Sequence, residues 1–372
     1  MKVLGLCSYP VEAAVTRYRL IQYINPLAEK GINLTVAPFL EGEDFYSLYK
    51  PGQNFRKSLR MLNLARKRFI DSLNSSRFDA LLVQREAMLF GPPIFEWFSK
   101  TISKCPLILD MDDATYVRYI SPTYGRLGSA LKFFGKTDTL IKWSETVICG
   151  NPYIAEYVAN KGKKAVIVPT VVDTDKFCPI EKDERIPLVV GWVGTQSTFP
   201  MLETLFPVLK DLSRKYDFTL KIIGAGRDEI KIDGVQVENL AWKLEREIED
   251  FQSLNIGLYP LEETQFVSKE FLMGKSGFKA IQYMSVGIPY VTKPIGGCAE
   301  IGIENETHFS ASTKEQWHNA LTKLLQSSER RRKMGEKGRH YALKHYTVPQ
   351  QANKIADVLQ KAVENFHQKM GK

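Results

Sequence analysis

The feature that most constrains this fold is the alternation, from end to end of the chain, of short apolar runs with longer amphipathic segments. This alternation predicts parallel strands joined by helices, because each strand is buried on both faces and each helix covers the sheet with one apolar stripe. The predicted strands span 2–7, 32–37, 80–83, 107–110, 146–149, 165–168, 188–193, 219–223, 235–238, 256–259 and 290–292. We therefore predict an α/β protein with two doubly wound sheets.

The length of 372 residues suits two domains, each with its own core. A charged, proline-bounded stretch at 179–187 is typical of a linker and places the boundary near residue 182. The predicted domains are 1–181 and 182–348. The remaining segment, 349–372, has apolar residues at helical spacing and is predicted to be a terminal amphipathic helix.

The composition, 44% hydrophobic and 25% charged, is that of a soluble globular protein. No segment approaches the ~20 apolar residues of a membrane span, and the N-terminal apolar run is a first strand, so we expect a cytoplasmic protein.

The cysteines are odd in number and widely separated, which argues against zinc sites and disulfides. They are Cys7, Cys105, Cys149, Cys178 and Cys298. The first 307 residues contain no histidine, which excludes histidine relays and histidine-ligated metals from most of the chain.

The net charge of +9 is concentrated in residues 1–180, where 24 Lys and Arg face 17 Asp and Glu. A basic half favours an anionic partner. Nucleic acid is disfavoured as a partner because no recognised nucleic-acid motif accompanies the charge.

Segment 55–69 has Phe55, Leu59, Leu62 and Phe69 on one helical face and six cations largely around it, as in helices that lie on anionic membranes. The alternative is a solvated helix that packs on its own domain. A membrane role predicts salt-sensitive vesicle binding that weakens when Arg56, Lys57 and Arg60 become Ser.

The densest candidate site is the run from Gly274 to Met284, with Lys275, Gly277 and Lys279 near its start. Glycines that open a helix leave backbone N–H groups at its positive end, and two lysines add full charges, so this run predicts a diphosphate site. The alternative is a surface helix with ordinary lysines.

Glycines or capping residues also stand just after several predicted strands, where ligands bind in open α/β sheets. In the second half these are Gly194 with Thr195, and Gly224 with Gly226. In the first half Asn151 and Pro152 form a helix start. Trp242 follows another strand and could frame a nucleotide base or belong to the core.

Charged residues near the ends of the N-terminal strands are further candidates. Arg17 and Arg19 could reach phosphates or an anionic acceptor, or lie on a solvated helix face. Arg85 and Glu86 end an apolar strand and predict a polar cleft wall.

The segment 110–113 follows a further strand and carries an Asp-x-Asp spacing that could hold a divalent cation. We favour Asp112 or Asp113 as the group that orients hydroxyls of a ligand bound at this edge. The alternative is an Asp that caps a following helix.

Together these motifs resemble retaining glycosyltransferases of the GT-B fold, family 4. The resemblance is carried by the run from Ile256 to Gly297, with Gly274-Lys275, Phe278-Lys279, Gln282-Tyr283-Met284 and Pro294-Ile295-Gly296-Gly297. It extends over nearly the whole chain through the shorter motifs at 84–86, 110–113, 151–153, 169–177 and 191–195. It implies two Rossmann-like domains, an acceptor-binding N-terminal half, a nucleotide-sugar-binding C-terminal half and a final helix that crosses back onto the first domain.

The sequence departs from that family at two places. Many relatives carry two glutamates eight positions apart at the donor helix, one on the sugar and one on the ribose, where this chain has Gly274 and Gln282. A common Arg after the first strand of the second domain is replaced by Gly191-Trp192. The resemblance then implies that Lys275 and Lys279 neutralise the phosphates of the donor, and that Phe278 is a further donor-binding residue.

The predicted function is transfer of a sugar from a nucleotide-diphosphate sugar to a cell-surface glycan, lipid-linked or other hydroxyl acceptor, with retention and with no metal or cofactor. The leaving diphosphate can take the acceptor proton, so no strong protein base is needed. Two alternatives stay open: a nucleotide-sugar epimerase of the same fold, and a non-catalytic nucleotide-sugar-binding partner.

Overall fold

The computed structural model describes residues 1–48, 52, 54–119, 125–181 and 187–371. The chain divides into two compact units. Unit 1 comprises 1–170, 274–276 and 348–372, and unit 2 comprises 171–273 and 277–347. The predicted boundary near residue 182 lies outside the described residues. Segment 171–181 belongs to unit 2, and the segment 274–276 lies in unit 1 although the chain on both sides of it belongs to unit 2.

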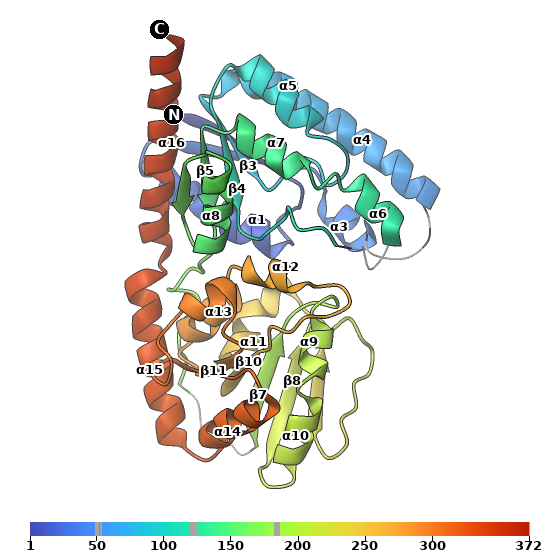
Figure 1. Ribbon diagram of the computed structural model, residues 1–372, viewed down its shortest axis with the longest axis vertical. Coiled ribbons are helices and arrows are strands. Elements are labelled where there is room, and N and C mark those ends of the chain that lie inside the picture. Colours follow the sequence, from blue (N-terminus) through green and yellow to red (C-terminus); the bar gives the residue numbers. More distant parts are fainter. Residues whose placement is uncertain (49–51, 53, 120–124, 182–186, 372) are drawn as a thin grey trace. The chain divides into compact units, whose positions relative to one another are not determined.

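Each unit is built on a six-stranded parallel sheet (Figure 1). The strands of unit 1 are β1 (Lys2–Cys7), β2 (Asn33–Pro38), β3 (Ala80–Gln84), β4 (Leu107–Met111), β5 (Thr146–Cys149) and β6 (Ala165–Ile167). Those of unit 2 are β7 (Leu188–Val193), β8 (Phe218–Ile223), β9 (Gln236–Leu240), β10 (Ile256–Tyr259), β11 (Tyr290–Thr292) and β12 (His308–Ser310). All eleven predicted strands are present. β12 was not predicted, because three residues with one central Phe give no apolar run.

The helices connect and cover these strands. In unit 1 they are α1 (Ala14–Arg19), α2 (Ile24–Ala28), α3 (Gly42–Leu48), α4 (Asn54–Leu73), α5 (Ile94–Ser103), α6 (Gly125–Leu131), α7 (Lys136–Trp143), α8 (Pro152–Asn160) and α16 (Val348–Met370). In unit 2 they are α9 (Phe199–Glu203), α10 (Phe206–Ser213), α11 (Glu247–Gln252), α12 (Lys269–Met273), α13 (Phe278–Ser285), α14 (Lys314–Leu325) and α15 (Ser328–His345). Short 3₁₀ turns are η1 (Ile21–Tyr23), η2 (Asn74–Arg77), η3 (Leu244–Arg246) and η4 (Gly296–Glu300).

The strand orders place a reversal point in each sheet. Unit 1 has the order β2-β1-β3-β4-β5-β6, which reverses between β1 and β3. Unit 2 has the order β9-β8-β7-β10-β11-β12, the Rossmann arrangement, which reverses between β7 and β10. Ligands of such sheets bind outside the carboxyl ends of the strands at this reversal, so residues that follow β1, β3, β7 and β10 are the ones to inspect.

Burial explains why the central strands were easy to predict. Every residue of β3, β4 and β8 is buried, whereas the edge strand β9 is mostly exposed or half-buried. The terminal helix α16 buries an apolar stripe that includes Ile355, Leu359 and Ala362, and it contacts α2 and β5 of unit 1. The predicted return of the last helix to the N-terminal half is therefore confirmed.

No helix within the described ranges is both long enough and apolar enough to cross a bilayer. The cysteines are all unpaired, and four of the five are buried.

Candidate functional site

The start of α13 in unit 2 has the geometry that the sequence predicted. Gly277 precedes the helix with φ of 66°, and a Cβ there would lie 2.0 Å from the Ile301 side chain, so no other residue fits. The Ala280 amide donates to the Gly277 carbonyl at 3.0 Å, so the first turn of the helix closes on this glycine.

The Lys279 side chain lies in the first turn of α13 and is half-buried. Its Nζ donates to Gln282 Oε1 at 2.9 Å and stands 5.0 Å from the Phe251 ring centroid and 5.9 Å from that of Phe278. These contacts distinguish Lys279 from an ordinary surface lysine, because they hold the ammonium beside the helix start. Gln282 itself is fully buried. Its amide is thus a support for Lys279 in this structure, whereas the sequence had suggested contact with a ribose.

The loops after β7 and β8 meet through glycines. A Cβ on Gly224, whose φ is 84°, would lie 2.4 Å from the Gly194 carbonyl oxygen. Gly226 has φ of 65° and lies against Gln196. The Thr195 amide donates to Thr198 Oγ1 at 3.0 Å, so the loop after β7 is closed on itself. At the ends of β7 and β8 the chain therefore presents glycine backbone, whereas Glu262 and Lys293, which follow β10 and β11, form an ion pair.

Two tryptophans of unit 2 have different roles. Trp192 is 3% exposed, lies in the main core and contacts Phe199, with ring centroids 6.1 Å apart. At the place where many relatives have an arginine, this chain therefore has a tryptophan that belongs to the core. Trp242 is half-buried, and its Cβ lies beside Gly224. The core alternative for Trp242 is thus not realised, and its position beside the glycine loops is compatible with a base-framing role.

The carboxyl edge of the unit 1 sheet is charged. Arg85 follows β3 with φ of 59° and donates to Asp112, with Nε to Oδ1 and Nη2 to Oδ2 both at 2.6 Å. The same Nη2 donates to Asp113 Oδ2 at 2.9 Å. Gln84 Nε2 also donates to Asp112 Oδ1, at 3.2 Å. Burial opposes the charged form of Asp112, but the Arg85 guanidinium outweighs it and lowers the pKa of this carboxyl.

Lys275 joins this cluster. Its Nζ lies 3.3 Å from Asp113 Oδ2, and both residues belong to unit 1. Asn151 fixes the same segment, because its Nδ2 donates to the carbonyls of Gly274 and Lys275 at 2.9 and 3.0 Å while its Oδ1 caps α8 as predicted. The sequence indicated the cap but not this second role of Asn151.

Gly274 has no room for the family's glutamate in this structure. A Cβ at Gly274 would lie 2.4 Å from Ala114 Cβ. A carboxylate that contacts this segment is that of Asp113, whose Oδ2 lies 3.3 Å from Lys275 Nζ. No helix begins at Asp112 or Asp113, since 112–119 contain only bends, turns and irregular backbone, so the capping alternative is wrong.

The other charged candidates of unit 1 are used inside the fold. Arg19 is 3% exposed, pairs with Asp110 and donates to the Val168 carbonyl at 2.7 Å, which leaves it no path to a ligand. Glu86 pairs with Lys132 and with Lys136. Arg17 donates to the carbonyls of Val11 and Glu12 at 3.0 and 2.8 Å. The expected solvent-facing or phosphate-binding arginine at Arg19 is replaced by a buried ion pair.

The carboxylates of 110–113 therefore face guanidinium and ammonium groups. Within the described part of the chain, no three His, Cys, Asp or Glu side chains are grouped as metal ligands.

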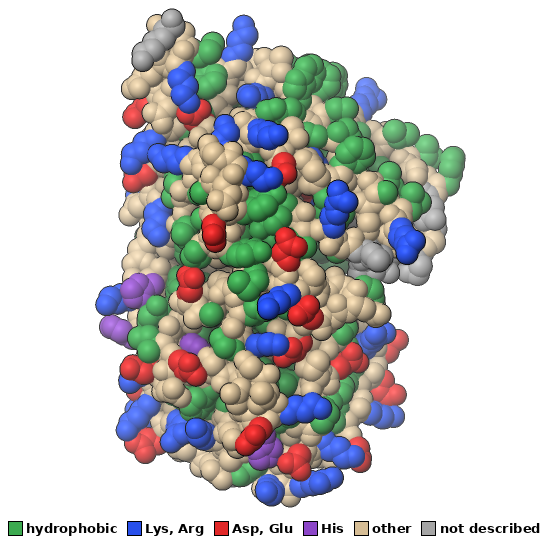
Figure 2. Space-filling view, in the orientation of Figure 1, with side chains coloured by type: hydrophobic (Ala, Val, Ile, Leu, Met, Phe, Trp, Pro, Cys, Tyr) green, Lys and Arg blue, Asp and Glu red, His purple; other side chains and the backbone are tan. Residues whose placement is uncertain are grey.

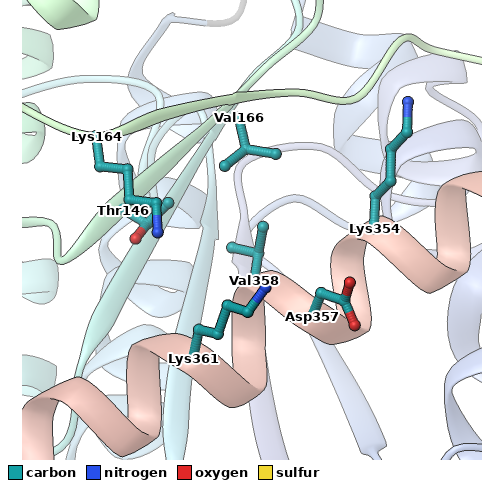
Figure 3. A pocket seen from close by; sticks show the side chains of 7 residues that line it. All are labelled: Thr146, Lys164, Val166, Lys354, Asp357, Val358 and Lys361. Carbon is teal, nitrogen blue, oxygen red and sulfur yellow. The ribbon is translucent and has the colours of Figure 1, made fainter.

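A pocket of about 200 Å³ lies elsewhere in unit 1, beside α16 (Figure 3). Val166 of β6 and Val358 of α16 point toward each other across it, and its rim carries Lys164, Lys354 and Lys361. It contains none of the predicted site residues. The pocket marks the place where α16 passes the short edge strand β6.

The comparisons with known proteins agree with the fold and with the position of α13. Residues 265–341 match the family model of glycosyl transferases group 1, and this segment contains α13 and its preceding loop. No curated protein sequence matches the chain.

Three solved structures share the fold at low identity. HepE of Anabaena in complex with UDP-glucose has a TM-score of 0.68 and 13% identity, covering 97% of this chain and 100% of that one. A glycosyltransferase from Rickettsia africae has a TM-score of 0.67 and 12% identity, covering 98% and 99%. Sucrose-phosphate synthase from Thermosynechococcus elongatus has a TM-score of 0.67 and 12% identity, covering 97% and 99%. The resemblance to GT-B glycosyltransferases is thus confirmed for the fold and, over residues 265–341, for the sequence.

Proposed function

We propose that this protein is a glycosyltransferase that takes a sugar from a nucleotide-diphosphate sugar and transfers it, with retention, to a hydroxyl acceptor. The observation that carries the proposal is the start of α13, where Gly277 opens the helix and the Lys279 ammonium donates to Gln282 within the segment that matches the group 1 model. Helix amides and an ammonium together form a site for a diphosphate. The complex of HepE with UDP-glucose supports a uridine nucleotide sugar as the first donor to test.

In this proposal unit 2 binds the donor. The amides at Gly277 and the Lys279 ammonium stabilise the departing diphosphate as its charge increases. The loops at Gly194 and Gly224 allow the backbone close approach to the nucleotide, and Trp242 stands beside them for the base.

Unit 1 provides the groups that orient hydroxyls. The Asp113 carboxylate, which pairs with Arg85 and Lys275, accepts a hydrogen bond from a sugar or acceptor hydroxyl in this proposal. It takes the role that a glutamate at Gly274 would have had. The leaving diphosphate oxygen takes the proton of the attacking hydroxyl, so the absence of histidine from residues 1–307 is no obstacle.

The acceptor that we propose is a cell-surface glycan or lipid-linked hydroxyl compound, reached from the cytoplasmic side by a protein that binds the membrane peripherally. The basic first half of the chain supports an anionic acceptor or surface.

Donor binding followed by product analysis tests this function. Thermal-shift measurements with UDP, GDP, ADP and their sugars should show stabilisation by one nucleotide series, as expected when a ligand binds only the folded state. Incubation of the best donor with acceptor pools should then release the free nucleotide and a glycosylated product. Released isomers of the donor would favour the epimerase, and stabilisation without turnover on any acceptor would favour the binding partner.

A further inference from the structure

The outer face of α4 is apolar and exposed. Seven positions form this face: Phe55, Leu59, Leu62, Arg66, Phe69, Ile70 and Leu73. Six of them are large hydrophobic residues, and Phe55 and Leu62 are 79% and 67% exposed. The opposite face, with Leu64, Arg68 and Ser72, is buried against unit 1. Helix α4 thus packs on its own domain with one face and presents a second apolar face to solvent.

Helix α5 continues this surface. Phe69 of α4 contacts Phe98 of α5 edge to face, with ring centroids 5.4 Å apart, and Trp97 contacts Phe98 at 4.9 Å. Trp97 and Ile94 are each 48% exposed. Figure 2 shows hydrophobic side chains gathered over α4 and α5 of unit 1, with cationic side chains among them. We name the outer face of α4 together with Ile94 and Trp97 the α4–α5 surface.

Five of the six cations of α4 divide into two groups. Arg60 and Lys67 pair with Glu41, Arg60 also pairs with Asp44, and Arg68 donates to the carbonyls of Cys7 and Ala37. These three stabilise the fold. Arg56 and Arg66 are exposed, and Arg66 lies within the apolar face. The effect of Arg60 on vesicle binding stays a prediction, and Arg66 is a further cation to test.

The charge of the surface decides between occupants. Helices α4 and α5 carry seven Lys and Arg against two acids, and three of these cations, Arg60, Lys67 and Arg68, are already paired or buried within the fold. Of these acids Glu96 is buried, and Asp71 is only 25% exposed at its side chain. A second copy docked symmetrically would place the same cations against each other, which disfavours a dimer through this face. An anionic bilayer complements both properties, because it accepts apolar side chains and attracts cations.

We propose that the α4–α5 surface docks this protein onto an anionic lipid bilayer. The apolar side chains enter the interface, Trp97 lies at headgroup level, and Arg56 and Arg66 contact lipid phosphates. This docking would bring the proposed glycosyltransferase to an acceptor at the membrane. Only that statement about the acceptor rests on the proposed function.

Vesicle flotation tests this docking without any activity measurement. Vesicles of phosphatidylglycerol and phosphatidylcholine should bind the full-length protein, pure phosphatidylcholine should bind it much more weakly, and high salt should release it. The double variant Phe55→Ser/Leu62→Ser should weaken binding by at least ~10-fold, because two exposed apolar anchors are lost. Arg66→Ser should weaken binding to anionic vesicles by ~5-fold and leave binding to neutral vesicles unchanged.

The matched control is Ile303→Ser/Leu343→Ser, which removes exposed apolar side chains from unit 2, 47% and 41% exposed. This control should bind vesicles like the parent. Equal binding to both vesicle types, or full binding by a folded Phe55→Ser/Leu62→Ser variant, overturns the proposal. A parent dimer that this variant dissociates would assign the surface to a second copy and overturn it as well. Nucleotide-induced thermal shifts should be the same in all variants, so a failure here is distinct from a failure of donor binding.

Discussion

The carboxyl edges of the two sheets use opposite chemistry. In unit 1 the edge is formed by charged side chains, with Arg85, Asp112 and Asp113 in one network. In unit 2 the edge after β7 and β8 is formed by glycines: Gly224 and Gly226 have positive φ, and a Cβ on Gly224 would lie 2.4 Å from the Gly194 carbonyl oxygen. The two edges thus suit different ligands, because fixed carboxylates orient hydroxyl groups whereas bare backbone and a helix start accept phosphates. Removing a side chain should therefore be the damaging change in unit 1, and adding one should be damaging in unit 2.

The largest expected effect is on the stability of unit 1. Arg85→Ala leaves Asp112, whose side chain is 8% exposed, without its bidentate partner. Removal of one member of a buried pair costs about 3 kcal/mol. Chemical denaturation should show this loss in the free energy of unfolding. Arg126→Ala, an exposed arginine of the same unit, is the control and should change it by less than about 0.5 kcal/mol. An Arg85→Ala protein as stable as this control would show that the charged network is not structural.

The next effect is on catalysis in unit 2. Lys279→Ala should lower kcat by ~10²-fold, about 2.7 kcal/mol, because the ammonium stabilises the diphosphate most strongly in the transition state. Nucleotide affinity should fall less. Lys279→Met keeps the apolar stem over Phe251 and should be equally slow, which separates charge from packing. Lys269→Ala, an exposed lysine of unit 2, is the matched control. Near-normal kcat in a folded Lys279→Ala protein would contradict the proposed donor site.

A smaller effect is expected from a single added methyl group. Gly224→Ala places a Cβ 2.4 Å from the Gly194 carbonyl oxygen at a φ of 84°, so the loop must move or stay strained. We expect a loss of stability of about 2 kcal/mol and weaker nucleotide binding. Thermal unfolding with and without nucleotide measures both. Gly162→Ala, also at positive φ but with no atom within 4 Å, is the control for backbone strain alone. If both variants behave alike, close approach of the loops is not what requires glycine.

The smallest expected effect is that of chelation. The carboxylates of Asp112 and Asp113 are paired with Arg85, and Lys275 is beside them, so their charge is already compensated. In the proposed function, the α13 start and Lys279 bind the diphosphate. Transfer rates should therefore be unchanged in EDTA. If EDTA abolishes transfer and Mg²⁺ or Mn²⁺ restores it, the carboxylates of 110–113 bind a metal ion that the reaction needs. The carboxyl edge of unit 1 would then also take part in binding the diphosphate.

The sequence by itself determined the architecture. Central strands such as β3 and β4 are buried on both faces, so they are written as continuous apolar runs. The α13 start and the Asn151 cap were also local signals, because backbone conformation at a helix end depends on the residues that form it. The three-residue strand β12 carries no such signal and was found only in the structure.

Only the tertiary structure decided which charges are available. Arg19, Arg60 and Arg68 look like surface or ligand-binding cations in the sequence, yet each is paired or hydrogen-bonded with residues distant along the chain. Likewise, the residue that faces Gly274 is Ala114, and the carboxylate that meets Lys275 is Asp113. A side chain's partners depend on the packing of elements far apart in sequence, and burial makes an unpaired charge too costly to leave. Local sequence patterns therefore specify the elements, whereas packing specifies the electrostatics of the site.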